Sequence, residues 1–191
     1  MRATVADAIL DAALAVASEH GVEAATAAAI AARAGVAVGT LYNYFPDRDG
    51  IFAALFTQRR AALAPRITAA AEAVAGLPFA PRLRGFVDAL LTIFEDQRAF
   101  LRLAITAADA GLARAKATGP QLLPLLEQAF EDIVRAGASA RRFPAAQAPA
   151  LARMLLGAVK GLALWRIAEG EPMAGDGPLV CDAWLGGLDR R

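Results

Sequence analysis

The chain has 191 residues, of which 57% are hydrophobic and 20% charged, and its formal net charge is +1. This length is sufficient for one large or two small domains, and the composition is that of a globular protein with much apolar surface to bury, inside the chain or against a second copy. Alanine is abundant and β-branched runs are few, so helix is favoured almost throughout and nothing reads as a strand.

The sequence also argues against a disulfide-bonded, secreted or membrane-spanning protein. Its single cysteine, Cys181, excludes an intrachain disulfide and favours a reducing compartment. Asp7 and Asp11 interrupt the apolar N-terminal segment, so no signal peptide is predicted. An uncharged stretch of about 18 residues, as a membrane span requires, is not found. We therefore expect a cytoplasmic protein without membrane contact.

Capping residues and helix breakers divide the chain into about nine helices, which predicts an all-α fold. Thr4 caps the first helix, which His20 and Gly21 end, and Pro65 is expected to kink the long fourth helix. The later helices are expected at 26–34, 38–45, 47–75, 81–96, 98–115, 119–137, 145–169 and 176–188. This layout predicts a three-helix head at residues 1–47 and a helical body for ligand binding and dimerisation at residues 48–191.

The stretch from Thr26 to Asp49, TAAAIAARAGVAVGTLYNYFPDRD, has the spacing of a helix-turn-helix. Thr26 is a suitable N-cap for the first helix of the pair, and Gly35 suits the left-handed residue after it. Pro46 disfavours helical dihedrals at Phe45 and so ends the second helix there.

The outer side of the second helix carries side chains that suit DNA. The hydroxyls of Thr40, Tyr42 and Tyr44 can donate to phosphate oxygens, and Asn43 can pair with an adenine edge. Arg48 is expected in the first turn of the next helix, where it and free backbone N–H groups would face the same anion. The alternative is a helical corner with exposed aromatics.

At these residues the chain resembles the tetracycline-repressor (TetR) family of bacterial transcription regulators. AGVAVGTLYNYFPDRDGIF is similar to the family's core signature, and DAILDAALAVASEHGVEAAT to the helix before it, so the resemblance covers about residues 5 to 56. It implies that Thr26 and Tyr42 contact phosphates and that Thr40 reaches phosphate or base. It further implies that Tyr44 and Arg48 support contacts to the DNA backbone. Val38, Gly39 and Asn43 would then lie near base edges.

Three positions depart from the family pattern. Ala25-Thr26 stands where a pair of threonines is common, and Ala37 replaces a frequent capping serine, which forfeits about 1 kcal/mol. Arg48 replaces a common lysine, which keeps the charge and changes the geometry.

The predicted head is acidic. Residues 1–50 contain three basic and six acidic residues, a net of −3, and the remaining 17 basic and 13 acidic residues give +4. DNA binding would therefore depend on hydroxyls, backbone amides and helix ends. Arg59, Arg60 and Arg66, which follow the head in sequence, could add positive charge. We expect weak non-specific binding and a modest salt slope.

Phenylalanines on three successive helices of the body are candidates for an apolar small-molecule site. A packed core is the alternative, and the family resemblance favours an effector in this region. The candidate ligand-binding residues are Phe86, Leu90, Phe94, Phe100, Leu103, Thr106 and Phe130. A small, largely hydrophobic effector is expected.

The last two long helices are predicted to form a two-fold association surface. Gly157 and Gly161, four residues apart, would let a partner helix approach closely. The alternative is that both apolar stripes bury inside the monomer. The candidate interface residues are Leu151, Leu155, Ala158, Leu162, Trp165, Cys181, Trp184 and Leu188. A dimer would present two recognition helices to a palindromic operator.

The residues offer little for catalysis. His20 is the only histidine, and Cys181 lies in an apolar stretch without a nearby base. No metal site, cofactor site or enzymatic activity is predicted. We expect a homodimeric, ligand-responsive regulator of transcription, most simply a repressor. The competing hypothesis is a helical ligand- or protein-binding relative that has lost DNA binding, which the acidic head would support.

Overall fold

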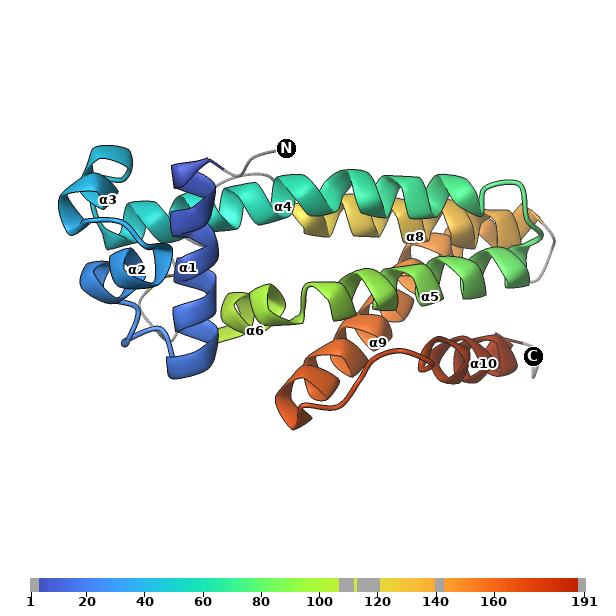
Figure 1. The fold of residues 1–191 in the computed structure, drawn as a ribbon. Helices are drawn as coiled ribbons and strands as arrows, with labels where there is room; N and C mark the ends of the chain where they lie inside the picture. The colour runs from blue at the N-terminus through green and yellow to red at the C-terminus, as the bar shows by residue number, and fades with distance from the viewer. Residues whose placement is uncertain (1–3, 107–111, 113–120, 140–142, 189–191) are drawn as a thin grey trace. The chain divides into compact units, whose positions relative to one another are not determined.

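The computed structural model describes residues 4–106, 112, 121–139 and 143–188, and within these ranges the regular elements are all helices (Figure 1). The chain forms two compact units. The first contains Met1–Ala62 and Arg98–Pro120, and the second contains Leu63–Gln97 and Gln121–Arg191. The all-α prediction is confirmed.

In the first unit, α1 (Val5–His20) packs against α2 (Ala27–Ala34) and α6 (Arg98–Thr106). A capping box starts α1: the Asp7 amide donates to Thr4 Oγ1 (3.1 Å), and the Thr4 amide donates to Asp7 Oδ2 (3.0 Å). These bonds satisfy amides that a helix start leaves unpaired. Ile9, Ala13 and Val16 lie on the buried side of α1, with the spacing of an amphipathic helix.

The turn between α2 and α3 (Val38–Tyr44) has the predicted conformation. Gly35 has φ 70° and ψ 29°, and Val36 N donates to Ala31 O at 3.0 Å, which is a Schellman motif. Phe45, which precedes Pro46, is extended at φ −135° and ψ 131° and ends α3. The two helices are therefore joined by the short turn that a helix-turn-helix requires.

The fourth helix, α4 (Arg48–Ala73), continues through Pro65. Its first turns bury Ile51, Phe52, Leu55 and Phe56 in the first unit. Phe56 lies 5.8 Å from Phe100 of α6, measured between ring centroids. The first unit therefore includes α6 and the start of α4, which complete its core, and the division of function at residues 47/48 stays a prediction.

The second unit contains the rest of α4 with α5 (Phe79–Asp96), α8 (Leu122–Ser139), α9 (Ala148–Glu169) and α10 (Gly177–Leu188). A short 3-10 helix, η2 (Ala145–Gln147), precedes α9. Phe86 of α5 and Phe130 of α8 pack edge to face with centroids 5.1 Å apart. The core of this unit is thus built from apolar faces of helices, as the sequence predicts.

Helix ends agree with the predictions to within a few residues where the structure describes them. The break at Gln97 is confirmed, and it separates α5 from α6. α6 ends at Thr106 within the described residues, and the remainder of the predicted helix 98–115 lies outside them, apart from Leu112. α8 begins and ends slightly later than predicted.

The segment Ala145–Glu169 is long and apolar enough, by length and composition alone, to cross a membrane. Core helices of soluble proteins pass the same test. It carries Arg153 and Lys160, and the residues on one side of α9 are buried within the unit, where α9 packs against α8.

Candidate nucleic-acid interface

The two sides of α3 are used differently. Leu41 is 0% exposed and anchors the helix, whereas Tyr42 and Tyr44 are each 50% exposed. Val38 and Asn43 are also exposed. Gly39 is exposed as well, and Thr40 is half-buried. One side of this helix is therefore held by the core while polar and aromatic side chains on the other remain available to a partner.

Thr26 is the N-cap of α2, as predicted. Its Oγ1 accepts a hydrogen bond from the Ala29 amide at 3.2 Å, and the residue is exposed. The hydroxyl proton can still be donated outward, for example to a phosphate oxygen. Ala37 is the N-cap of α3 and makes no side-chain bond, so the loss of the capping interaction is also confirmed.

Arg48 differs from its predicted role. Its Nε donates to Ala25 O at 3.1 Å and its Nη2 to Val22 O at 2.5 Å, so the guanidinium is bound to the protein's own backbone. Asp47 Oδ1 accepts from the Gly50 amide at 2.6 Å, which caps the start of α4. The expectation that the Arg48 guanidinium faces an anion is therefore corrected, because it donates to the protein's own backbone, and the Gly50 amide of the same turn is bound by Asp47.

Three other arginines were expected to provide outlying positive charge, and each has a partner. Arg59 forms an ion pair with Asp11. Arg66 Nη2 donates to Asp96 Oδ2 at 2.5 Å. Arg60 is buried, with its guanidinium carbon 5.4 Å from the centroid of Phe56, and burial lowers its pKa. Each of the three arginines thus has a partner within the chain, and their help to DNA binding stays a prediction.

The candidate ligand residues fall in both units. Phe86, Leu90, Phe94 and Phe130 are buried in the second unit, and their packing there is that of a core. In the first unit Phe100 and Leu103 are buried and Thr106 is exposed. The contact between Phe86 and Phe130 supports the packed-core alternative for those two residues.

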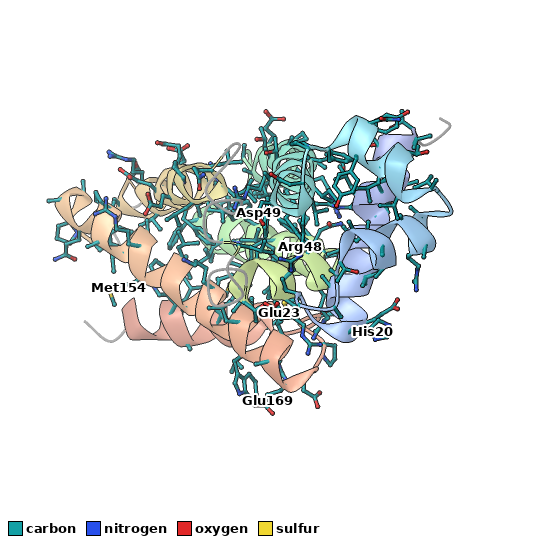
Figure 2. The ribbon with its side chains drawn as sticks, turned by 90° about the vertical axis from the view of Figure 1, so that its left-hand side faces the viewer. His20, Glu23, Arg48, Asp49, Met154 and Glu169 are labelled. Atoms are coloured by element: carbon teal, nitrogen blue, oxygen red, sulfur yellow. The ribbon has the colours of Figure 1, made fainter. Side chains whose placement is uncertain are left out.

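A cleft of about 640 Å³ lies within the first unit. Residues 17–23, at the end of α1 and in the following turn, form one wall, and Arg102, Leu103 and Thr106 of α6 form the other. His20 and Glu23 of this wall are labelled in Figure 2. Leu103 and Thr106 are the two candidate ligand residues that line this cleft.

Among the candidate dimer residues, the structure places Leu155 and Cys181 in the interior of the second unit, each 0% exposed. They are corrected to core residues, because such side chains offer nothing to a second copy. Ala158 and Trp165 are exposed. Leu151, Leu162 and Trp184 are half-buried, and the side chain of Leu188 lies outside the described part.

The exposed apolar side of α9 is rotated relative to the predicted stripe. It contains Met154, Gly157, Gly161 and Leu164, spaced by three and four residues (Met154 in Figure 2). A Cβ added at either glycine would meet no atom within 4 Å, so this surface is open.

The Cys181 thiol is unsuited to nucleophilic chemistry. Burial, with the charge of Asp88 as a smaller cause, raises the pKa of Cys181 to about 12. The thiol is therefore protonated at neutral pH. Within the described ranges, His, Cys, Asp and Glu side chains form no group of three or more that could hold a metal.

The fold and the exposed helix can be compared with known proteins. Residues 9–55 match the family described as "Bacterial regulatory proteins, tetR family". Over 40 residues the chain is 62% identical to the HTH-type transcriptional repressor KstR of Mycolicibacterium smegmatis and 60% identical to KstR of Mycobacterium tuberculosis. The similarity to the TetR family therefore lies in residues 9–55, which include the helix-turn-helix.

The match to the KstR repressors covers 21% of this chain and 20% of the M. smegmatis protein. The likeness to solved structures extends further. The fatty acid degradation regulator FadR from Bacillus halodurans aligns over 100% of both chains, with a TM-score of 0.72 and 20% identity. FadR from Bacillus subtilis, in complex with stearoyl-CoA, covers 94% of this chain and 97% of its own, with a TM-score of 0.71 and 18% identity. At these identities the alignments establish the fold.

Sequence reasoning missed the backbone contacts of Arg48. A signal was present: Phe52 follows Arg48 by four residues, one helical turn, and the guanidinium carbon lies 5.3 Å from its ring centroid. An arginine four residues before a core aromatic can lie over that ring and face inward.

Proposed function

We propose that this protein is a DNA-binding regulator of transcription whose α3 enters the major groove. The observation that carries the proposal is the exposed side of α3. Tyr42, Asn43 and Tyr44 are exposed there, while Leu41 on the opposite side is buried in the core. Hydroxyls and an amide on a short helix suit phosphate oxygens and base edges. The identity to the KstR repressors supports repression as the direction of control.

Little of the proposed affinity comes from charge. α3 has no charged residue, and Arg33 of α2 is held by Glu19 through two bonds of 2.8 and 3.0 Å. Hydroxyl and backbone donors release few counterions when they bind phosphate. We therefore expect the logarithm of the binding constant to fall only modestly with the logarithm of salt concentration.

The active form that we propose is a homodimer. Met154, Leu164 and Trp165 expose apolar surface on α9, and Gly157 and Gly161 leave room for a second helix beside them. A two-fold dimer would present two copies of α3 to half-sites about one helical turn apart, that is, to a palindromic operator. Access to chromosomal DNA implies a cytoplasmic location.

Release from DNA is proposed to follow binding of a small, largely hydrophobic effector to the helical body. The structural likeness to FadR, one example of which was solved with stearoyl-CoA, supports an apolar effector. The effector must favour the form that does not bind DNA, and each factor of ten in operator affinity requires about 1.4 kcal/mol of that preference.

A relative that has lost DNA binding is the second candidate. The observation in its favour is that Arg48, Arg59 and Arg66 are all engaged within the chain. Under this hypothesis the exposed tyrosines of α3 would meet another partner.

Tyr42 provides the test. We expect Tyr42→Ala to weaken binding to a retained genomic fragment by roughly tenfold or more, since it removes both the hydroxyl and the exposed ring. Tyr42→Phe keeps the ring and is expected to show a smaller loss. Fluorescence anisotropy measures both, and the unchanged melting temperature of each variant serves as the control. Wild-type affinity in Tyr42→Ala would contradict the placement of α3 on DNA.

A further inference from the structure

We propose that Arg48 is a positioning residue, which fixes the helix-turn-helix on the first turn of α4 and does not itself contact DNA. The effect of Arg48 on operator affinity rests on the proposed DNA binding, whereas its role in holding the helix-turn-helix does not. The contacts themselves lie within the first unit.

Three contacts hold the Arg48 side chain. Nε donates to Ala25 O at 3.1 Å, Nη2 donates to Val22 O at 2.5 Å, and the guanidinium carbon lies 5.3 Å from the Phe52 ring centroid. The residue is half-buried, and Figure 2 labels it. A planar guanidinium can donate in two fixed directions while stacking on an aromatic ring, which an ammonium group cannot reproduce.

Both acceptors belong to the turn that joins α1 to α2. The Ala25 amide donates to Val22 O at 3.1 Å, and the Thr26 amide donates to Ala24 O at 2.8 Å. Ala25 is 0% exposed and Thr26 is the N-cap of α2. The two Arg48 bonds therefore fix the residues that determine where α2 begins, and α3 follows α2 through the Gly35 turn.

Other contacts attach the opposite end of α1 to the same helix. Gln58 Nε2 donates to Asp7 Oδ1 at 2.6 Å, and Arg59 forms an ion pair with Asp11. α4 therefore contacts the N-terminal half of α1 through Gln58 and Arg59, and it contacts the turn that follows α1 through Arg48. Any displacement of the first turns of α4 would be passed to the helix-turn-helix, with Arg48 as the link closest to α2.

The test compares Arg48→Lys, Arg48→Met and the matched control Arg33→Met. Arg33 belongs to the same unit and pairs with Glu19 on the surface, so its loss removes one positive charge without touching the α1–α2 turn. Operator affinity is measured by anisotropy over a range of salt concentrations.

A positioning role predicts that both Arg48 variants weaken binding by roughly tenfold or more while the salt slope stays that of the wild type. Arg33→Met should remain within a few-fold of the wild type. A phosphate contact predicts another pattern: Arg48→Lys binds like the wild type, and Arg48→Met lowers the slope by about 0.9. That pattern would overturn the proposal.

Hydrogen exchange gives a readout without DNA. We expect the Ala25 and Thr26 amides to exchange faster in Arg48→Lys and Arg48→Met than in the wild type and Arg33→Met, because the turn loses its attachment to α4. Unchanged protection in Arg48→Lys would overturn the proposal even if DNA binding fell. If the wild type bound no DNA, the proposed function would fail, and the exchange experiment would still decide the role of Arg48.

Discussion

Leu41 and Tyr42 are neighbours in α3 whose side chains have opposite surroundings. Leu41 is fully buried and sets the orientation of the helix, while Tyr42 is half exposed beside Asn43. Arg48 is a second case in which the contacts differ from what the residue type suggests. This charged residue at a helix start donates to the protein's own backbone. Exposure and hydrogen-bond partners, more than residue type, therefore assign the roles of single residues in this unit.

Gly137 of α8 illustrates how packing outweighs helix propensity at one residue. A Cβ at this position would lie 2.8 Å from the ring of Phe79, which itself contacts Phe143 and Trp184. We expect Gly137→Ala to lower the free energy of unfolding by about 1–3 kcal/mol. The gain of up to about 1 kcal/mol from replacing a helical glycine offsets only part of this cost.

Urea unfolding measures the effect of Gly137→Ala. Gly186→Ala is the control, because a Cβ there meets no atom within 4 Å. A double variant with Phe79→Leu should recover part of the loss, since the smaller side chain leaves room for the methyl group. A Gly137→Ala protein as stable as the wild type would show that the ring moves aside at little cost.

At the scale of helices, the local features were predictable and the long-range ones were not. The Thr4 and Thr26 caps, the Gly35 turn and the end of α3 at Phe45 depend on a few neighbouring residues, so the sequence contains the information. The two acceptors of Arg48 lie 23 and 26 residues away along the chain, which no local pattern specifies.

The orientation of α9 shows a second limit of sequence patterns. Apolar residues occur on every side of this helix, among them Leu151, Met154, Leu155 and Leu164. Periodicity alone cannot decide which of them faces α8. The predicted association stripe therefore included the buried Leu155 and omitted the exposed Met154.

The capping box of α1 makes a prediction about pH. Hydrogen bonds from the amide and hydroxyl of Thr4 lower the pKa of Asp7, with a smaller contribution from Gln58. A lowered folded-state pKa means that the ionised carboxylate stabilises the fold at neutral pH. This contribution is lost as the pH falls through the folded-state pKa.

We therefore expect Asp7→Asn to melt at a lower temperature than the wild type at pH 7. The difference should shrink as the pH is lowered below the usual range of an aspartate, because the wild-type carboxyl is then neutral as well. Circular dichroism melting across this pH range measures it. Equal melting temperatures at pH 7 would contradict the stabilising role of the ionised cap.

At the scale of the whole molecule, the proposed regulator requires a second copy. Leu164 on α9 is 44% exposed, and Leu123 on α8, in the same unit, is 45% exposed. We expect Leu164→Glu to weaken dimerisation by roughly tenfold or more, because a carboxylate would be desolvated in an apolar contact. Leu123→Glu is the matched control and should leave the association constant unchanged.

Sedimentation equilibrium over a range of concentrations gives both association constants. An equal loss in the two variants would indicate a general effect of added charge, and no loss in Leu164→Glu would place the interface elsewhere.

The central claim, that this chain recognises DNA through α3, is tested most directly by binding the wild-type protein to fragments of its own genome and sequencing those retained at two salt concentrations. We predict that retained fragments share a palindrome with two half-sites and that retention weakens only modestly at the higher salt. Binding that is indifferent to sequence and abolished by salt, or no binding at all, would contradict the claim and favour a relative that has lost DNA recognition.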